Sequence, residues 1–437
     1  MKIIMVNYRY FISGGPERYF FNVKDLLEAN GHEVIPFSVK NEQNKETPYE
    51  SYFLEPIGEK NEVYFSEYKK SNLLTVIKSF SRMFYSFEAR KKLDALIKAV
   101  NPDLIYVLHY QNKISVSIFD AAAKNKVPVV HRISDFGQIC ANALFYRPTQ
   151  KDICERCLTG SKFNAIANKC VYNSYIYSSI KVAALKMQEI IGITKKVDAF
   201  VVPSKFTLEK LRSYGFPAQK LVHIPSFFNF QTISKELHIT YEPFALYIGR
   251  IESEKGLLTL VKSFVNTPFN LKIIGFSTSG FDEELKEYLK DKSHHIEFLG
   301  KMKFEEIQIY LSKCLFTVVP SEWYDNFPNT ILESFAFKKC AIATNTGSLV
   351  ELVIDNETGL LFNIKDIEDL KSKITCLFGN MEMCQNLGSN AFNMLNEVYS
   401  AREHYKRLSD LFRKVIRNYE SPNKISNTHT VVNEIYG

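Results

Sequence analysis

The sequence predicts an α/β protein built from two doubly wound parallel sheets. Short apolar runs alternate with amphipathic helical stretches along the chain, which is the pattern of successive βαβ units. The pattern occurs twice, and an irregular segment containing proline and aromatic residues, 225–241, separates the two copies. At 437 residues the chain is also too long for one ordinary core. We therefore expect two Rossmann-like domains.

The first copy, expected over residues 1–228, contains two helical patterns, Glu17–Ala29 and Ser204–Ser213. The earlier helix should end before Gly31, because glycine favours the left-handed conformation that follows a helix. Insertions interrupt this copy near 41–100 and 140–195. Its apolar runs are interpreted as strands over Lys2–Asn7, Glu33–Phe37, Leu104–His109, Pro128–Arg132, Ala199–Val202 and Leu221–Ile224.

The second copy, expected over 229–400, repeats the alternation without large insertions. Its strands are predicted over Phe244–Ile248, Leu271–Ile274, Ile296–Leu299, Leu315–Val319, Cys340–Ala343 and Leu360–Phe362. Its helices are predicted over Gly256–Val265, Phe281–Lys290, Phe304–Ser312, Pro328–Phe337 and Ile367–Phe378. We expect a C-terminal helix, 401–420, to pack back on the first domain, and the polar residues 421–437 to form a flexible tail.

The composition is that of an ordinary globular protein, with 46% hydrophobic and 24% charged residues. The apolar runs are too short to span a bilayer, and the N-terminus lacks the features of a secretory signal. We therefore expect a cytoplasmic protein. The net charge of +7 comes from 55 basic and 48 acidic residues mixed along the chain, which is typical of a solvated surface. We expect no nucleic-acid partner.

The segment PSEWYDNFPNTILE, residues 320–333, combines a strand end, a loop and a helix start. Pro328 suits the opening of a helix because its missing N–H would have no intrahelical partner. The free N–H groups around Asn329, Thr330 and Ile331 at a helix start form a natural site for a diphosphate.

Two acids in this segment could bind sugar hydroxyls. Glu333 lies one turn inside the predicted helix, where it could accept from a ribose, and Asp325 lies in the preceding loop, eight residues earlier. For either acid alone an ordinary surface position is the simpler explanation. Together with the helix start, they predict a site for a sugar linked to a diphosphate.

A second motif, YIGRIESEKG, follows the first strand of the second copy. Gly249 permits close backbone approach, and Arg250 and Lys255 could neutralise a diphosphate that gains charge as its bond to a sugar breaks. The alternative is that these cations pair with Glu252 and Glu254 at the surface.

These motifs resemble those of retaining family-4 glycosyltransferases of the GT-B fold. The resemblance covers most of the chain, and its motifs occur in the family's order and spacing. They are SGGPERYFFNVKDLLEANGHEV, YIGRIESEKG, LKIIGFS, IEFLGKM and PSEWYDNFPNTILESFAFKKCAIATNTGSLVELVIDNETGLLF.

The resemblance implies a role for each matching residue. Arg250 and Lys255 match the pair that holds the donor diphosphate, and Glu333 matches the second acid of the E-x(7)-E motif, which binds the ribose. Asp325 stands where the family has the first glutamate of this motif, which contacts the transferred sugar. The side chain of Asp325 is one methylene shorter than that glutamate. The other implied donor-binding residues are Gly15, Gly249, Gly275, Lys301, Met302, Asn326, Phe327, Asn329 and Thr330.

The acceptor side departs from the family pattern. Relatives often carry a histidine before the aspartate of VVHRISDFG, and this chain has Ser134 there, followed by Asp135. Alternation along a strand places Arg132, and not His131, on the same face as Ser134. The acceptor candidates are therefore Arg9, His109, Arg132, Ser134 and Asp135.

The resemblance also implies a mechanism without a protein nucleophile, in which the departing phosphate takes the proton of the acceptor on the same face of the sugar. The chain contains no D-x-D triplet, so we expect no catalytic metal. The implied donor is a UDP- or GDP-sugar, and the implied acceptor is a glycan or a lipid-linked saccharide.

Four of the eight cysteines cluster in the second insertion. Their thiolates would suit a structural, tetrahedral zinc ion, although the spacing is not that of a zinc ribbon. The alternative is a buried thiol cluster that holds the insertion together. These residues are Cys140, Cys154, Cys157 and Cys170.

The first insertion contains a basic amphipathic stretch, Lys69–Leu93, with seven lysines and arginines and one acid. It predicts a helix that could lie on the anionic inner face of the cell membrane. The alternative is a helix that packs on its own domain.

Other functions remain as alternatives. The same scaffold could serve a nucleotide-sugar epimerase or hydrolase, and a zinc-scaffolded binding protein is a more distant choice. A dehydrogenase is disfavoured because no G-x-G-x-x-G follows a predicted strand.

Overall fold

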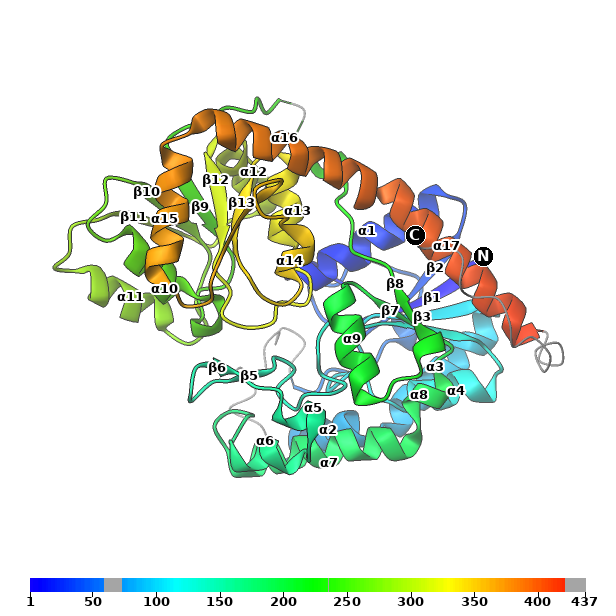
Figure 1. Ribbon diagram of the computed structural model, residues 1–437. Coiled ribbons are helices and arrows are strands. Elements are labelled where there is room, and N and C mark those ends of the chain that lie inside the picture. The colour runs from blue at the N-terminus through cyan, green and yellow to red at the C-terminus, as the bar shows by residue number, and fades with distance from the viewer. Residues whose placement is uncertain (59–72, 235, 421–437) are drawn as a thin grey trace. The chain divides into compact units, whose positions relative to one another are not determined.

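The computed structural model describes residues 1–58, 73–234 and 236–420 (Figure 1). Its contacts divide the chain into two compact units. The first comprises Met1–Arg132, Ile191–Phe200 and Tyr405–Gly437, and the second comprises Ile133–Ile190 and Val201–His404. The second unit thus includes the cysteine-bearing insertion, which the sequence assigned to the first domain. The predicted tail, 421–437, lies outside the described residues.

The N-terminal half carries a six-stranded sheet in the order β2-β1-β3-β4-β7-β8. Strand β1 pairs in parallel with both β2 and β3, and β3 pairs in parallel with β4. Almost every residue of these central strands is buried, as expected for a parallel sheet covered on both faces. The strands are β1 (Lys2–Val6), β2 (Glu33–Phe37), β3 (Leu104–Val107), β4 (Val129–Arg132), β7 (Ala199–Val202) and β8 (Leu221–His223).

The C-terminal half carries a second six-stranded sheet in the order β11-β10-β9-β12-β13-β14, with every neighbouring pair parallel. The order reverses around β9, which is the doubly wound arrangement that places ligands at the strands' carboxyl ends. The strands are β9 (Phe244–Ile248), β10 (Asn270–Ile274), β11 (His295–Gly300), β12 (Phe316–Val319), β13 (Ala341–Thr344) and β14 (Gly359–Phe362).

Two apolar cores cover the faces of this second sheet. Successive residues of β9 alternate between them, with Ala245 and Tyr247 in one core and Phe244 and Leu246 in the other. Helices α10 (Leu257–Phe264), α11 (Phe281–Leu289) and α15 (Ile367–Phe378) supply the first core. Helices α12 (Phe304–Lys313), α13 (Asn329–Ala336), α14 (Leu349–Leu352) and α16 (Met381–Val398) supply the second.

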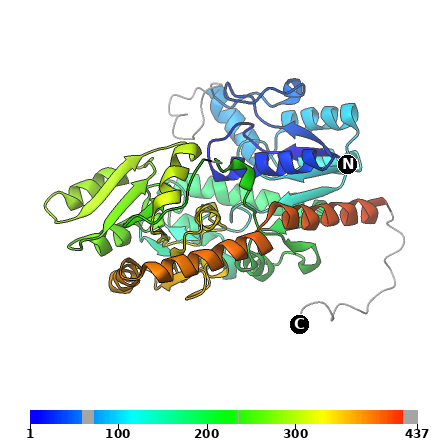
Figure 2. The ribbon, with the colours of Figure 1, turned by 90° about the horizontal axis from the view of Figure 1, so that it is seen from above.

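The remaining helices belong to the N-terminal half and to the C-terminus, where α16 and α17 follow each other directly (Figures 1 and 2). From Tyr405 onward α17 belongs to the first unit, where the Tyr405 hydroxyl lies 2.9 Å from Nε2 of His32. These helices are α1 (Gly15–Ala29), α2 (Leu73–Phe84), α3 (Phe87–Val100), α4 (Ile118–Lys124), α5 (Arg156–Thr159), α6 (Phe163–Ala167), α7 (Tyr175–Ile191), α8 (Ile193–Lys196), α9 (Lys205–Tyr214) and α17 (Ala401–Glu420).

The two parallel sheets confirm the predicted fold class. Each predicted strand is present, with ends that differ by at most two residues. The sequence reading missed α16 and a small hairpin, β5 (Tyr146–Arg147) with β6 (Asp152–Ile153), inside the cysteine-bearing insertion. The expected single helix over Lys69–Leu93 is wrong, because α2 and α3 are separate helices and Ser86 caps the second of them.

Candidate active site

The carboxyl ends of β9 and β10 approach each other closely enough to require glycine. A Cβ atom on Gly275 would lie 1.8 Å from the carbonyl oxygen of Gly249, so the backbone would have to move to admit any other residue. The Gly275 N–H in turn donates to the Gly300 carbonyl oxygen at 2.9 Å. Three adjacent strand ends are thereby joined into one edge, from which the next loops begin.

The two predicted diphosphate-binding cations are held differently. Arg250 follows β9 with an exposed side chain that pairs with Glu254 at 3.1 Å, which is the surface pairing considered as its alternative. Lys255 is largely buried, and its Nζ lies 2.7 Å from Oδ2 of Asp325. Ser321 donates a further hydrogen bond to the same oxygen at 3.0 Å. The structure therefore brings Lys255 and Asp325 together.

Helix α13 begins at Asn329, with Pro328 as its N-cap in an extended conformation, one residue later than predicted. The prediction that the Ile331 N–H is free is wrong, because this group donates to the Pro328 carbonyl oxygen. The N–H groups of Asn329 and Thr330 precede this first bonded amide. Glu333 lies in the next turn and is 5% exposed. The helix start and the second acid thus occupy neighbouring turns, with the carboxylate almost removed from water.

The other predicted donor residues serve packing as well. The amide of Asn326 is occupied on both sides, because its Oδ1 accepts from Thr207 at 2.5 Å and its Nδ2 donates to the Ile133 carbonyl at 3.2 Å. Phe327 and Met302 pack partly buried against the core of the second sheet. Lys301 Nζ lies 4.9 Å from the ring centre of Phe276.

A residue that the sequence reading missed anchors the loop between β12 and α13. Glu155, inside the C-x-x-C of the insertion, accepts from the Tyr324 hydroxyl at 2.7 Å and from Lys210 Nζ at 2.6 Å. Ser348 also holds this loop, because its hydroxyl donates to the Asp325 carbonyl at 2.6 Å. The sequence offered no signal for the contact, since Glu155 and Tyr324 are 169 residues apart.

In the first unit, a charged cluster links the loop between β1 and α1 to the first turn of α1. Arg9 donates to the Ser13 hydroxyl at 2.7 Å, and Ser13 donates to Oε2 of Glu17 at 2.9 Å. Arg9 and Glu17 also pair at 3.5 Å. Gly15 is the first residue of α1, and Glu17 is buried in its first turn. Glu17 was not among the predicted residues, although an acid in a first helical turn after two glycines could have suggested it.

His109 follows β3, and Arg132 is the last residue of β4 in the same unit. His109 Nδ1 lies 3.2 Å from Oδ1 of Asn7. Burial lowers the pKa of His109 to about 4, with Arg132 and Arg9 contributing in the same direction and Glu17 opposing them, so the imidazole is neutral at physiological pH. The guanidinium of Arg132 lies 3.8 Å from the ring centre of Tyr19.

Ser134 and Asp135, the remaining acceptor candidates, belong to the second unit. Oδ1 of Asp135 accepts from the Gly137 N–H at 2.7 Å, which closes a tight turn after β4. Within each unit, the structure thus brings together Arg9 with the glycine loop and Lys255 with Asp325.

The four clustered cysteines are free thiols in the second unit. Cys157 and Cys170 pack into one small apolar cluster, and Sγ of Cys140 lies 3.0 Å from Oδ1 of Asn142. Burial raises the pKa of Cys157 to about 11 and that of Cys170 to about 12, with neighbouring cysteines adding to both shifts. Within the described ranges, no three His, Cys, Asp or Glu side chains are placed to hold a metal ion.

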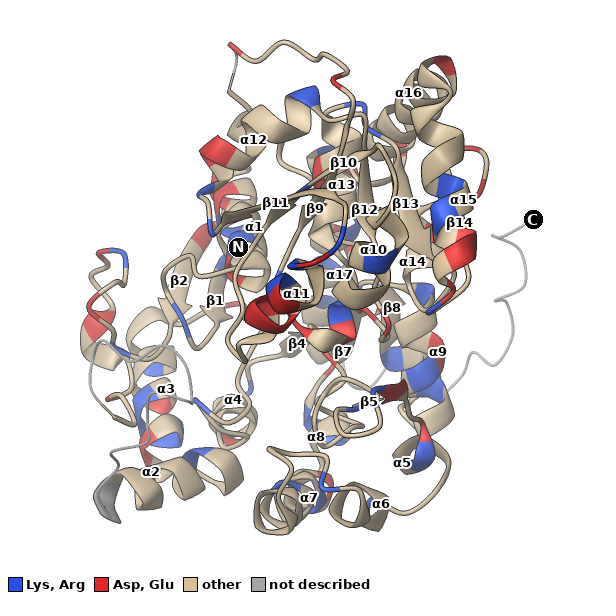
Figure 3. Cartoon of the chain, turned by 90° about the vertical axis from the view of Figure 1, so that its left-hand side faces the viewer, with Lys and Arg blue, Asp and Glu red and all other residues tan. Residues whose placement is uncertain are grey.

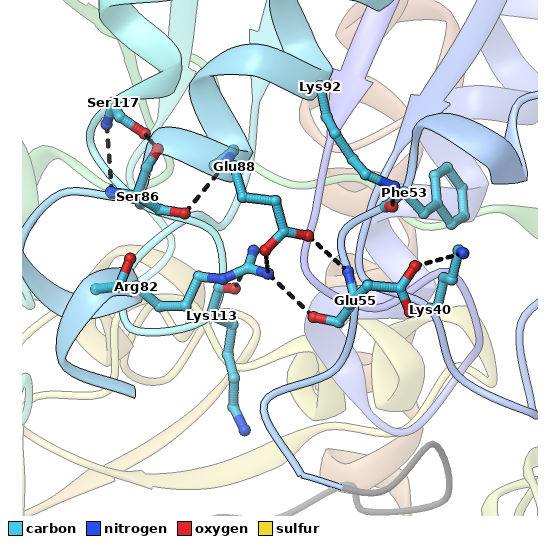
Figure 4. Close-up of polar contacts among 12 residues, drawn as sticks. Lys40, Phe53, Glu55, Arg82, Ser86, Glu88, Lys92, Lys113 and Ser117 are labelled. Atoms are coloured by element: carbon cyan, nitrogen blue, oxygen red, sulfur yellow. Dashed lines mark hydrogen bonds and ion pairs between the residues drawn. The ribbon is translucent and has the colours of Figure 1, made fainter. Parts of the chain in front are cut away.

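Two basic residues of the stretch Lys69–Leu93 turn inward, whereas Lys78 and Lys91 are exposed (Figure 4). Arg82 is 1% exposed, pairs with Glu88 at 2.8 Å and donates to the Glu55 carbonyl oxygen at 3.0 Å. Lys92 turns inward to the carbonyl oxygens of Ser51 and Phe53. Lys69 and Lys70 lie outside the described residues. Buried backbone acceptors compete for these cations, which the composition of the helix could not reveal.

The sequence also matches known protein families over both halves. The profile described as Glycosyltransferase Family 4 matches residues 13–231, about half of the chain, and the profile described as Glycosyl transferases group 1 matches residues 229–394. The chain belongs to glycosyltransferase family 4. No helix in the described part of this glycosyltransferase is long and apolar enough to cross a membrane.

Three curated relatives illustrate the range of similarity. An uncharacterized glycosyltransferase of Methanocaldococcus jannaschii is 34% identical over 38% of this chain and 49% of its own length. The capsular polysaccharide biosynthesis glycosyltransferase CapM of Staphylococcus aureus is 23% identical over 56% of this chain and 66% of its own length. An N,N'-diacetylbacillosaminyl-diphospho-undecaprenol alpha-1,3-N-acetylgalactosaminyltransferase of Campylobacter jejuni is 24% identical over 50% of this chain and 61% of its own length. The chain thus spans about half to two thirds of the length of these relatives.

Solved structures share the fold over nearly the whole chain. Sucrose-phosphate synthase from Thermosynechococcus elongatus has a TM-score of 0.68 at 18% identity, covering 95% of this chain and 99% of its own. Anabaena HepE in complex with UDP and glucose has a TM-score of 0.59 at 14% identity, covering 94% and 99%. At these identities the likeness concerns the GT-B fold alone, which confirms the fold predicted from the motifs.

Proposed function

We propose that this family 4 glycosyltransferase is a retaining, metal-independent enzyme that transfers a hexose from a UDP- or GDP-sugar bound by its second unit. The observation that carries the proposal is the buried pair of Lys255 with Asp325 beside the start of α13. A cation, a helix N-terminus and two acids in one unit supply the groups that a sugar nucleotide needs. The complex of HepE with UDP and glucose supports a nucleotide-sugar donor.

Each group has a proposed task in donor binding. Lys255 and Arg250 contact the diphosphate, together with the N–H groups of Asn329 and Thr330. Glu333 accepts from the ribose hydroxyls. Asp325 accepts from hydroxyls of the transferred sugar, and the ion pair with Lys255 holds its carboxylate in place before the donor arrives. Such preorganised charges act mainly as the diphosphate departs.

The transfer itself needs no protein nucleophile in this proposal. The bond between the anomeric carbon and the diphosphate breaks, and its electron pair stays on the phosphate oxygen. That phosphate oxygen takes the proton of the acceptor hydroxyl. The acceptor oxygen then bonds to the anomeric carbon on the same face that the phosphate leaves. Positioning and charge stabilisation then account for the rate. Arg9, His109, Arg132, Ser134 and Asp135 remain the proposed acceptor residues.

The acceptor is proposed to be a growing glycan or a lipid-linked saccharide at the inner face of the cell membrane. The support comes from the relatives, since CapM is named for capsular polysaccharide biosynthesis and the Campylobacter enzyme for a diphospho-undecaprenol substrate. A cytoplasmic location would give the enzyme access to both kinds of acceptor.

Nucleotide binding tests the donor site directly. Trp323 is the chain's single tryptophan, and Lys255 Nζ lies 4.9 Å from its ring centre, so its fluorescence reports on the site. We expect UDP or GDP to change this fluorescence and raise the melting temperature. Lys255→Met should weaken the binding of UDP or GDP about 10- to 100-fold, because one charged hydrogen bond is lost. The matched control is Lys286→Met, an exposed lysine that pairs with Asp282 in the same unit.

Turnover assays test the reaction. Glu333→Gln should lower transfer strongly while leaving the melting temperature of the free protein near its original value. Release of nucleotide only when acceptor lipid is present separates transfer from hydrolysis or epimerisation, and the anomeric coupling of the product reports retention. EDTA should leave the rate unchanged. If neither UDP nor GDP altered the Trp323 fluorescence or the melting temperature, the proposed donor site would be refuted.

A further inference from the structure

Helix α7 turns an apolar side outward. Ile176 and Ile190, near its two ends, are 71% and 73% exposed. Ile180, Ala183 and Met187 lie between them at alternating steps of three and four residues, none of them buried. This spacing aligns all five side chains along one side of a helix. We call this set, Ile176, Ile180, Ala183, Met187 and Ile190, the α7 stripe.

The inward side of α7 is the more polar one. Ser178, Lys181 and Gln188 are buried there, beside the small Ala184 and the single large aliphatic Leu185. This inverts the usual arrangement, in which a surface helix buries its apolar side. The helix therefore contacts its own unit through polar and small side chains together with Leu185 and Val182, while Ile176 and Ile190 stay exposed in the described part of the chain.

Exposed aromatic residues extend the surface around the start of α7. Tyr172 and Tyr175 are exposed, and the ring of Tyr172 meets that of Tyr177 edge to face, with centres 5.6 Å apart. Lys169 Nζ lies 4.6 Å from the ring centre of Tyr175. Tyrosines, whose rings have an apolar body and a polar tip, and lysines with flexible stems are the residues that collect at the boundary between lipid tails and headgroups.

The charge of this region favours an anionic partner. Residues 156–188 contain five lysines and arginines and no acid, and four of the five are at least partly exposed, whereas Lys181 is buried. The basic residues on α5 and α7 are drawn in blue in Figure 3. The first acid afterwards is Glu189, which pairs with Lys186 at 3.1 Å and also with Lys162. Docking a second copy on the same surface would bring two such basic regions together, which costs free energy.

We propose that the α7 stripe, with Tyr172 and Tyr175, docks this protein on an anionic lipid bilayer. The stripe lies in the boundary below the headgroups, and lysines such as Lys169 contact lipid phosphates. The inference deepens the proposed lipid-linked acceptor, because it places the enzyme where such an acceptor lies. Its basis is the exposed surface alone, and it does not depend on nucleotide binding.

Sedimentation with vesicles tests this proposal. The wild-type protein should bind vesicles of phosphatidylglycerol and phosphatidylcholine in equal parts, more weakly at high salt, and pure phosphatidylcholine vesicles much less. The double variant Ile176→Glu, Ile190→Glu should lose about tenfold or more in affinity for the anionic vesicles. The control is Ile309→Glu, which changes an isoleucine that is 46% exposed on α12 in the same unit and should bind as the wild type does.

Three results would overturn the proposal. One is equal vesicle binding by the double variant and the wild type. Another is a concentration-dependent dimer in sedimentation equilibrium that the double variant abolishes, which would assign the stripe to a second copy. The third is loss of vesicle binding in Ile77→Glu, on the exposed side of α2, but not in the double variant. Nucleotide titration of Trp323 in the double variant keeps this question separate from the donor site, since that titration should be unchanged.

Discussion

Single residues in this protein acquire their properties from the partners that the fold gives them. Arg250 and Lys255 are both cations after β9, yet one is exposed and pairs with Glu254 while the other is largely buried against Asp325. A buried pair loses less of its attraction to screening by salt. We therefore infer that Lys255 contributes more to donor binding than Arg250 does.

His109 should make the stability of the protein depend on pH in mild acid. Its folded pKa of about 4 lies below the ordinary value of 6.5, so the unfolded chain takes up the proton first. The contribution of a neutral His109 is complete above pH 6.5 and is lost as the pH falls toward 4. His109→Gln should therefore show a smaller loss of unfolding free energy between pH 6.5 and 4, measured by urea unfolding. Parallel pH profiles for the two proteins would contradict this assignment.

Gly256 and Gly280 separate backbone strain from steric overlap. Both have a left-handed φ, +72° and +84°, but a Cβ on Gly256 would lie 1.9 Å from the Pro320 carbonyl oxygen, whereas nothing lies within 4 Å of one on Gly280. Gly280→Ala should cost about 1–2 kcal/mol through its conformation. Gly256→Ala should cost about 1–3 kcal/mol more through overlap. Calorimetric melting of the two variants measures the difference, and equal costs would show that the backbone at Pro320 yields freely.

At the scale of elements, the loop from β12 to α13 depends on contacts from distant segments. Glu155 binds the hydroxyl of Tyr324, Ser348 donates to the main chain at Asp325, and Thr207 donates to the side chain of Asn326. This explains how a loop without regular structure can present Asp325 in one place. In the proposed donor site, Glu155 and Tyr324 are therefore positioning residues that act through the loop.

Tyr324→Phe tests that role. Removing the hydroxyl leaves Glu155 with one hydrogen bond fewer, and we expect nucleotide binding to weaken about 5- to 10-fold, the equivalent of one hydrogen bond. Trp323, its neighbour, should show a shifted emission maximum even without nucleotide. The control is Tyr310→Phe on α12, a partly buried tyrosine outside this loop. Unchanged emission and affinity in Tyr324→Phe would show that the loop holds its shape without Glu155.

At the scale of the whole molecule, the two units should respond separately to ligand and to mutation. Phe412 of α17 is fully buried in the first unit, with its ring centre 5.2 Å from that of Tyr106. Phe412→Ala should cost about 3–5 kcal/mol. In differential scanning calorimetry, Phe412→Ala should lower the melting temperature of the first unit. UDP or GDP should raise only the melting temperature of the second unit. Arg413→Ala, on the exposed side of the same helix, is the control. A single transition moved by both changes would show that the units unfold together.

The sequence by itself determined the two sheets, the order of their strands along the chain and the motifs at the strand ends. It could do so because alternation of apolar residues and the chemistry of glycine and proline act over a few neighbouring positions. Only the tertiary structure decided that Lys255 meets Asp325 across 70 residues, that Arg82 turns inward and that α7 faces its apolar side outward. Those outcomes depend on which distant groups compete for a charge or a surface, and local sequence does not encode that competition.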